Sequence, residues 1–392
     1  MSFRKVVYVR YFPLTAKVFN DFYMADVEEC GISVEYWDLT EIFFKIGFDQ
    51  EDSSHLVLTT KFNSYLDLEH AIKENSSPTT LFVSIMTFES RVEKLFRIFT
   101  KYNSQISVFG RNMFPLASGK SVSLITRLMR ITPAKLIEYF KIKRLKKAKN
   151  LNQIKRYDYI FLGGSLGYGG IGNTDYDELK YSKIIQVNSD DYDACLALKN
   201  QNSIYSHKYI LFLDEYLPLH PDTQLFNIKN ISPDEYYPQL CEYFDRVESE
   251  FKMPIVIAAH PKALRYKTED FFNGREVVFG KSAELSVGAE FIIAHDTTSI
   301  NYPIALDKRI HFISSRNIER GINIVHQNVL HFAKYLGCNF QWFDKNEKIN
   351  LIQSVPVDNY KRYKYEFQTS PDTEDKMTKD IFISFLKTSV RE

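Results

Sequence analysis

Two short runs in the second half of the chain, Ile-Val-Ile-Ala-Ala at 255–259 and Phe-Ile-Ile-Ala at 291–294, decide the fold. Both are apolar at every position, without the alternation of a strand that has one face in water. Runs of this kind are typical of parallel strands that helices cover on both faces. We therefore expect an α/β protein with doubly wound parallel sheets.

Similar runs recur along the whole chain, bounded by turn residues and spaced widely enough for a crossover helix between them. A helix over 236–251 is predicted by apolar residues at helical spacing. The expected strands are 5–10, 33–38, 80–86, 106–109, 157–162, 183–187, 209–213, 254–259, 276–279, 290–294 and 309–313.

The length of the chain and a polar stretch at 199–203 predict two domains. The chain has 392 residues, more than a single hydrophobic core usually serves. We predict Rossmann-like domains over 1–200 and 201–375, facing a cleft, and a C-terminal helix in 376–392. Ile381, Phe382, Phe385 and Leu386 would form the apolar face of that helix.

The composition excludes several classes of protein. The net charge of +1 creates no field that would attract nucleic acid, so no such partner is expected. The four cysteines lie far apart without metal-ligand spacing, which indicates neither a disulfide framework nor a zinc site, and no other metal motif is present. No signal sequence and no apolar run of membrane-spanning length occurs, so we expect a cytoplasmic protein.

The segment from Lys141 to Lys149 is strongly basic, with six basic residues and no acidic one. Together with Ile137, Phe140 and Leu145 it predicts a basic amphipathic helix. Such a segment is often only a solvated helix face. It also suits peripheral contact with the inner face of the cytoplasmic membrane, because each Lys or Arg near anionic lipid adds about 1 kcal/mol. A polyanionic glycan is a third partner that it could meet.

Two motifs stand directly after expected strands, where ligands of doubly wound sheets bind. Asp214 and Glu215 follow the strand at 209–213, and a carboxylate there could act as general base on an acceptor hydroxyl or merely cap a turn. His260, Pro261 and Lys262 follow the strand at 254–259. An imidazole and an ammonium at that place can donate to a phosphate and stabilise a leaving nucleotide.

Two further stretches are candidates for ligand contacts. Thr297, Thr298 and Ser299 follow the strand at 290–294 and open an apolar helix, where hydroxyls cap the helix and free N–H groups attract anions. The Gly-rich stretch 163–172 contains Gly164 and Ser165 after another strand. It matches no nucleotide-binding fingerprint, and it is either an active-site loop or a structural turn.

Three of these motifs resemble, in order and setting, motifs of bacterial sialyltransferases with the GT-B fold. The acidic motif is similar to Asp214-Glu215, the HP motif to His260-Pro261-Lys262, and the Ser/Thr motif to Thr297-Thr298-Ser299. The chain is also similar to the wider group of capsule and O-antigen glycosyltransferases. The resemblance covers 209–313. It implies that Asp214 is the base, that His260 meets the donor phosphate, and that Thr298 and Ser299 make further phosphate or carboxylate contacts.

The same resemblance implies an inverting, metal-independent glycosyltransferase without a cofactor. Its substrates would be a nucleotide sugar, for example a CMP-linked nonulosonic acid, and a lipid-linked or lipopolysaccharide glycan. The first domain would take the acceptor and the second the donor. Other functions are possible on the same fold. One alternative is a different enzyme, either a CDP-polyol phosphotransferase or a sugar-nucleotide epimerase. The other is a non-catalytic glycan-assembly scaffold.

Overall fold

The computed structural model describes residues 2–44, 52–115, 133–172, 178–221, 231–350 and 354–388, which form two compact units. The first comprises the described residues within Met1–Met113, Ser121–Asp190 and Glu366–Glu392. The second comprises those within Phe114–Lys120 and Asp191–Tyr365. Both main boundaries fall earlier in the chain than 200 and 375, and the last part of the chain belongs to the first unit.

The first unit is built on a seven-stranded sheet in the order β3-β2-β1-β4-β5-β6-β7, and every pair of neighbouring strands is parallel. The strand order reverses direction between β1 and β4, as in Rossmann-like sheets. The strands are β1 (Lys5–Arg10), β2 (Ser33–Asp38), β3 (Thr59–Lys61), β4 (Thr80–Ser84), β5 (Gln105–Gly110), β6 (Tyr159–Gly163) and β7 (Lys183–Val187).

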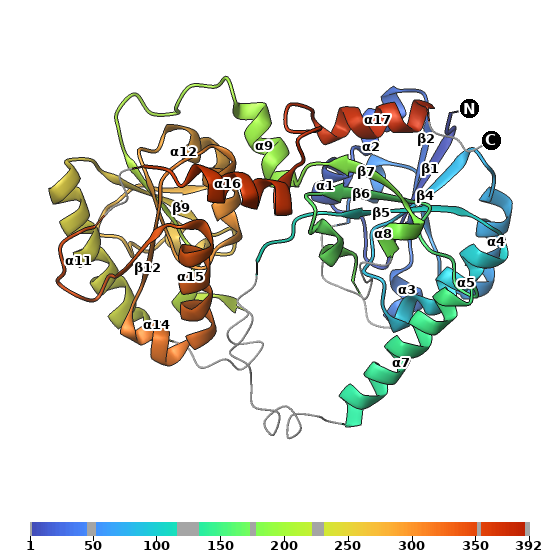
Figure 1. Ribbon diagram of the computed structural model, residues 1–392, viewed down its shortest axis with the longest axis horizontal. Helices are drawn as coiled ribbons and strands as arrows, with labels where there is room; N and C mark the ends of the chain where they lie inside the picture. The colour runs from blue at the N-terminus through green and yellow to red at the C-terminus, as the bar shows by residue number, and fades with distance from the viewer. Residues whose placement is uncertain are drawn as a thin grey trace. The chain divides into compact units, whose positions relative to one another are not determined.

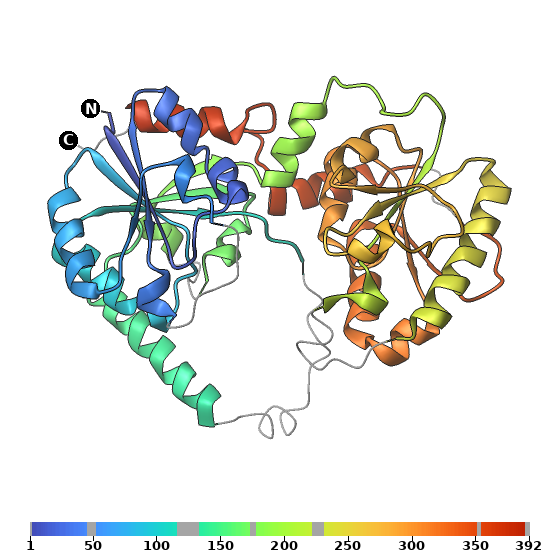
Figure 2. The ribbon, with the colours of Figure 1, turned by 180° about the vertical axis from the view of Figure 1, so that it is seen from behind.

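Helices cover both faces of this sheet, with α2 and α17 on one side and α5 and α7 on the other (Figures 1 and 2). Val7 and Val9 of β1 belong to one apolar core, and Val6 and Tyr8 belong to the opposite one. The α-helices of the unit are α1 (Ala16–Asp21), α2 (Met24–Glu29), α3 (Thr40–Phe43), α4 (Tyr65–Asn75), α5 (Glu93–Lys101), α7 (Pro133–Asn150), α8 (Glu178–Tyr181) and α17 (Thr378–Thr388).

The C-terminal helix α17 forms as predicted, and it packs on the first sheet. Phe382 meets the ring of Phe161 at a centroid distance of 5.0 Å, and Phe385 meets that of Tyr159 at 4.8 Å. Both phenylalanines are buried. The last helix of the chain therefore completes a core whose strands come from the first half.

The second unit has a six-stranded parallel sheet in the order β10-β9-β8-β11-β12-β13. Counted from β8, this is the order 3-2-1-4-5-6 of dinucleotide-binding folds, with its switch point between β8 and β11. The strands are β8 (Ile210–Leu213), β9 (Ile255–Ala259), β10 (Val277–Phe279), β11 (Ile292–Ala294), β12 (Ile310–Ser314) and β13 (Asn339–Trp342).

Helix α11 covers one face of the second sheet, and the ring of Phe312 in β12 stacks on Phe332 of α15 on the other. The predicted helix over 236–251 is confirmed, and it starts earlier, at Pro233, because Pro is favoured in the first turn of a helix. The α-helices are α9 (Asp190–Leu198), α11 (Pro233–Phe251), α12 (Ser282–Gly288), α13 (Asn301–Ala305), α14 (Arg316–Gly321), α15 (Asn323–Leu336) and α16 (Val357–Tyr363).

The expected class of two doubly wound α/β domains is confirmed by these two sheets. All eleven expected strands are present, and the described residues contain two short strands in addition, β3 and β13. Within the described residues, no helix combines the length and the apolar character needed to cross a bilayer.

Candidate functional site

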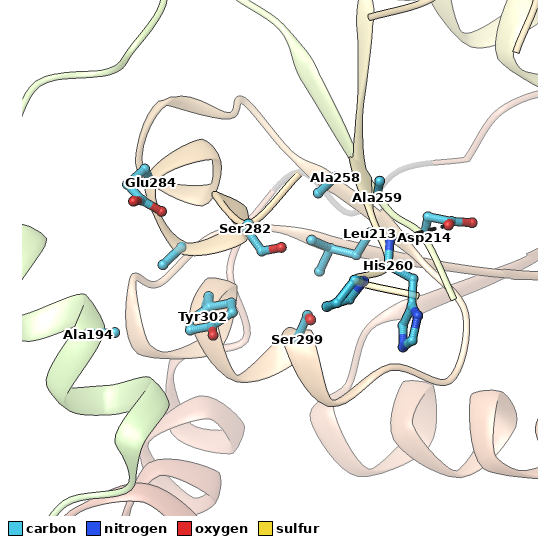
Figure 3. Close-up of a pocket in the computed structure, with 13 residues that line it drawn as sticks. Ala194, Leu213, Asp214, Ala258, Ala259, His260, Ser282, Glu284, Ser299 and Tyr302 are labelled. Atoms are coloured by element: carbon cyan, nitrogen blue, oxygen red, sulfur yellow. Dashed lines mark hydrogen bonds between the residues drawn. The ribbon is translucent and has the colours of Figure 1, made fainter. Parts of the chain in front are cut away.

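The carboxyl ends of the strands in the second unit surround a pocket of about 340 Å³ (Figure 3). This size lies within the usual range of small-molecule sites. Asp214 follows β8, His260 and Pro261 follow β9, and Ser299 lies beyond β11, so four of the sequence-predicted residues line this pocket. The lining residues are Ala194, Leu213, Asp214, Ala258, Ala259, His260, Pro261, Gly280, Ser282, Ala283, Glu284, Ser299 and Tyr302.

Asp214 is buried, with 4% of its surface exposed. Its carboxylate accepts from the Tyr266 hydroxyl at 3.4 Å and from the backbone N–H of His260 at 3.5 Å, and further from the N–H groups of Glu215 and Tyr216. Burial raises the pKa of Asp214 to about 6, and these hydrogen bonds oppose the rise. The carboxylate therefore ties the end of β8 to the end of β9.

Glu215 is partly buried, and the charge of a second carboxyl group, Asp296, acts on it. Burial raises the pKa of Glu215 to about 8; a hydrogen bond with Thr297 opposes the rise, and the charges of Asp296 and Asp214 add to it. Burial also raises the pKa of Asp296 to about 6, against a hydrogen bond from the Asn328 amide at 2.6 Å. Carboxyl groups that titrate near neutral pH are suited to acid or base catalysis.

His260 is held by its own turn. Its Nδ1 accepts from the backbone N–H of Lys262 at 3.2 Å, so the proton of the neutral ring is on Nε2. The ring of His220 lies at a centroid distance of 4.9 Å and an angle of 70°. An imidazole with a fixed Nε2–H can donate to a phosphate oxygen. The Lys262 and Pro261 side chains are exposed, and only Pro261 lines the pocket.

The three hydroxyl residues after β11 differ in position. Thr297 is buried and its Oγ1 accepts from the N–H of Ser299 at 3.1 Å, which caps the short turn η6 (Thr298–Ile300). Ser299 lines the pocket, whereas Thr298 is exposed. Of the three, Ser299 is the one placed to contact a ligand in the pocket.

Gly164 and Ser165 lie in the first unit, so they are not part of this pocket. Gly164 has φ +73°, and a Cβ added there would stand 2.6 Å from the carbonyl oxygen of Glu366. At Gly167 an added Cβ would collide with the carbonyl oxygen of Gly110. Close approach of backbones therefore explains these glycines, and a ligand contact of Gly164 and Ser165 stays a prediction.

Sequence reasoning missed Ser282, Glu284 and Tyr302, which line the pocket at a distance from Asp214 (Figure 3). Ser282 could have been found, since it lies shortly after the end of β10, at the start of α12. Asn328, whose amide donates to Asp296, could not, because it comes from the middle of α15. Among the described residues, no group of three or more His, Cys, Asp or Glu side chains is arranged to hold a metal ion.

Comparisons with known proteins give only loose likenesses. No family model and no curated protein matches the sequence. The structure is similar to the calicheamicin glycosyltransferase CalG4, at 10% identity and a TM-score of 0.43 over 98% of this chain and 95% of that one. It is similar to the wall teichoic acid polymerase TagF, at 12% identity and a TM-score of 0.49 over 98% and 88%.

A third similar structure is the UDP-GlcNAc 2-epimerase of Methanocaldococcus jannaschii, at 11% identity and a TM-score of 0.41 over 92% of this chain and 97% of that one. None of these likenesses reaches a TM-score of 0.5. The fold assignment therefore rests on the strand orders, and the functional argument rests on the pocket.

Proposed function

We propose that this chain is a glycosyltransferase that moves a sugar from a nucleotide donor to a bacterial cell-surface glycan, with inversion and without a metal ion. The observation that carries the proposal is the convergence of Asp214, His260 and Ser299 from three strand ends on one pocket. A carboxylate, an imidazole donor and a hydroxyl are the groups that a metal-free transfer of this kind needs.

In this proposal His260 faces the phosphate of the donor. Its Nε2–H donates to a phosphate oxygen and stabilises the charge that builds there as the bond to the sugar breaks. Ser299 supplies a second donor. A carboxylate after β8, Asp214 or Glu215, accepts the proton of the attacking acceptor hydroxyl.

The nucleotide occupies the pocket itself, where Ala258, Ala259, Gly280 and Ala283 leave room and Glu284 and Ser282 offer polar contacts. We propose a CMP-linked nonulosonic acid as the first donor to test, because of the resemblance of the acidic, HP and Ser/Thr motifs.

A binding titration tests the donor site. The purified protein is titrated with CMP, CDP, UMP, UDP and GDP, and the titrations are repeated with His260→Ala and with the exposed control Glu250→Gln. We expect one nucleotide to bind selectively, and the affinity to fall at least tenfold in His260→Ala only. Absence of binding by any nucleotide would contradict the proposal and favour a scaffold. A phosphodiester product would instead indicate a CDP-polyol phosphotransferase, and an epimerised nucleotide sugar would indicate an epimerase.

We also propose that α7 brings the protein to an anionic membrane surface at the inner face of the cytoplasmic membrane. Ile137, Tyr139 and Phe140 are each more than half exposed, and Lys143 and Lys147 are exposed farther along the helix. The prediction of the basic face is wrong for one residue, Lys149. Lys149 is buried, with Nζ 3.0 Å from Glu178 Oε2 and 3.7 Å from the ring centroid of Phe88, so it faces the core.

Vesicle flotation tests this contact. We expect the wild type to bind vesicles that contain anionic lipid. This binding should be lost in the Lys143→Glu and Lys147→Glu double variant, and also at high salt. Equal binding of both proteins, or no binding by the wild type, would contradict the contact without affecting the proposed reaction.

A further inference from the structure

The loop after β9 presents His260 to the pocket at one end and buries Tyr266 at the other. Backbone hydrogen bonds close this loop into two short turns. The N–H of Ala263 donates to the carbonyl oxygen of His260 at 2.9 Å, and the N–H of Tyr266 donates to that of Ala263 at 3.1 Å. The Tyr266 ring packs edge-on against Phe272, at a centroid distance of 5.1 Å. A displacement of Tyr266 is therefore transmitted to His260.

The carboxylate of Asp214 contacts both ends of this loop. Its Oδ1 accepts from the Tyr266 hydroxyl at 3.4 Å, and its Oδ2 accepts from the backbone N–H of His260 at 3.5 Å. Figure 3 shows Asp214 beside His260 at the edge of the sheet. Asp214 is buried and directly follows β8, which pairs with β9. One carboxylate on the neighbouring strand thus sets the place of the loop that carries His260.

Tyr237 of α11 holds the Tyr266 hydroxyl from the other side. The two hydroxyl oxygens are 2.8 Å apart, and both side chains are buried. An ionised carboxylate can only accept, so Tyr266 gives its one proton to Asp214 and accepts from Tyr237. Hydrogen bonds in such a chain strengthen one another where water is excluded. The chain from Tyr237 through Tyr266 to Asp214 therefore links a helix on the face of the sheet to the pocket at its edge.

Resting on the proposed function, we propose that Tyr266 is a positioning residue for His260, and that it acts through Asp214 with Tyr237 behind it. The two hydroxyls hold the carboxylate, and the carboxylate holds the backbone of His260. The imidazole then meets the donor phosphate already in place, so less ordering has to accompany binding. The described lining of the pocket includes Asp214 and His260 but neither tyrosine, so both tyrosines act at one remove from the ligand.

The first test is a nucleotide titration of variants that lack a single hydroxyl. The probe is the nucleotide that the wild type selects among CMP, CDP, UMP, UDP and GDP. Tyr243→Phe is the matched control, because the Tyr243 hydroxyl is buried in the same unit without a hydrogen-bond partner among the described residues. We expect the affinity to fall about threefold to tenfold in Tyr266→Phe, less in Tyr237→Phe and not in Tyr243→Phe. Wild-type affinity in Tyr266→Phe would overturn the proposal.

A double-variant cycle tests the route of the effect. If Tyr266 acts through His260, Tyr266→Phe should change the affinity by less than about twofold in a protein that already carries His260→Ala. The same loss in both backgrounds would contradict the route through His260.

The second test needs no nucleotide. The imidazole nitrogens of His260 are observed by NMR at pH 8 after isotope labelling of the histidines, and they are assigned with His260→Ala. In the wild type Nδ1 accepts from the backbone N–H of Lys262 at 3.2 Å. We expect Tyr266→Phe to shift the signals of both nitrogens, and Tyr243→Phe to leave them unchanged.

The two tests separate this inference from the proposed function. A merely structural role of Tyr266 would lower the stability of Tyr266→Phe and leave the His260 signals in place, and that result would overturn the positioning role. If the wild type binds no nucleotide, the proposed function fails, whereas the imidazole signals still decide whether Tyr266 positions His260.

Discussion

The Tyr236 hydroxyl lies 2.9 Å from Nε2 of His295, and both side chains are buried in the second unit. The Nδ1 atom of His295 lies 2.7 Å from the carbonyl oxygen of Ile313, which can only accept. Nδ1 therefore carries the proton, and Nε2 accepts from Tyr236. The neutral ring is fully satisfied by these two bonds, and a second proton would place a positive charge in a buried site.

This relationship predicts that His295 makes the protein less stable in acid. Burial lowers the pKa of His295 from 6.5 to about 4, so the unfolded chain binds its proton first as the pH falls. The stabilisation is complete above about pH 6.5, falls progressively toward pH 4, and amounts to about 3 kcal/mol at 1.36 kcal/mol per pKa unit. Urea unfolding of the wild type and His295→Gln should show a difference in stability that shrinks from pH 7 to pH 5. A difference in stability that is the same at pH 7 and pH 5 would contradict the lowered pKa of His295.

Glu215 should have the opposite effect on stability. Its folded pKa is raised from 4.5 to about 8, so the folded protein holds a proton that the unfolded chain loses, and stability falls as the pH rises between these values. Glu215→Gln is expected to stabilise the protein at pH 8 by a few kcal/mol and to be nearly neutral at pH 5. Thermal unfolding at the two pH values measures this. If Glu215→Gln lowers the stability equally at pH 5 and pH 8, the pKa of Glu215 is not raised in the folded protein.

Gly164 should tolerate no side chain. Gly164→Ala combines a positive φ with a Cβ 2.6 Å from the Glu366 oxygen and the Phe367 nitrogen, and we expect a loss of about 3 kcal/mol. Gly31 is the matched control, because it has φ +77° and nothing within 4 Å of an added Cβ. Gly31→Ala should lose only about 1 kcal/mol. Urea unfolding compares the two, and equal losses would exclude the contact as the cause.

Arg111 depends on the carboxylate of Asp190. The guanidinium is buried, 2.8 Å from Asp190 Oδ1, and donates to the backbone oxygen of Asp21 at 2.6 Å. Asp190→Asn removes the carboxylate that contacts this buried charge, and we expect a loss of about 3–5 kcal/mol. The exposed pair Arg265 and Glu269 is the control, and Arg265→Gln should lose less than about 1 kcal/mol. Chemical unfolding checks both, and a small loss in Asp190→Asn would contradict the role of the ion pair.

Apolar runs were sufficient to predict the central strands, because those strands are buried on both faces. The runs around 255–259 and 291–294 became β9 and β11. The edge strands β3 (Thr-Thr-Lys) and β13 (Asn-Phe-Gln-Trp) were missed, since a short strand with one neighbour needs no apolar run.

Strand-end reasoning found Asp214, His260 and Ser299, because the carboxyl ends of parallel strands meet at one edge of a sheet. It could not rank Asp214 against Glu215, since the difference lies in the hydrogen bonds around each carboxyl group. Nor could it explain the Gly-rich stretch, because the backbone that excludes a Cβ at Gly164 comes from Glu366, about two hundred residues later.

The packing of α17 on β6 has a consequence for how the protein is made. Synthesis proceeds from the N-terminus, and the first sheet is finished by β7 long before the residues of α17 emerge from the ribosome. Until then, the surface that Phe382 and Phe385 will cover on Phe161 and Tyr159 is open to water and to chaperones. The second unit can complete its core during that interval, so the unit that is translated first should mature last.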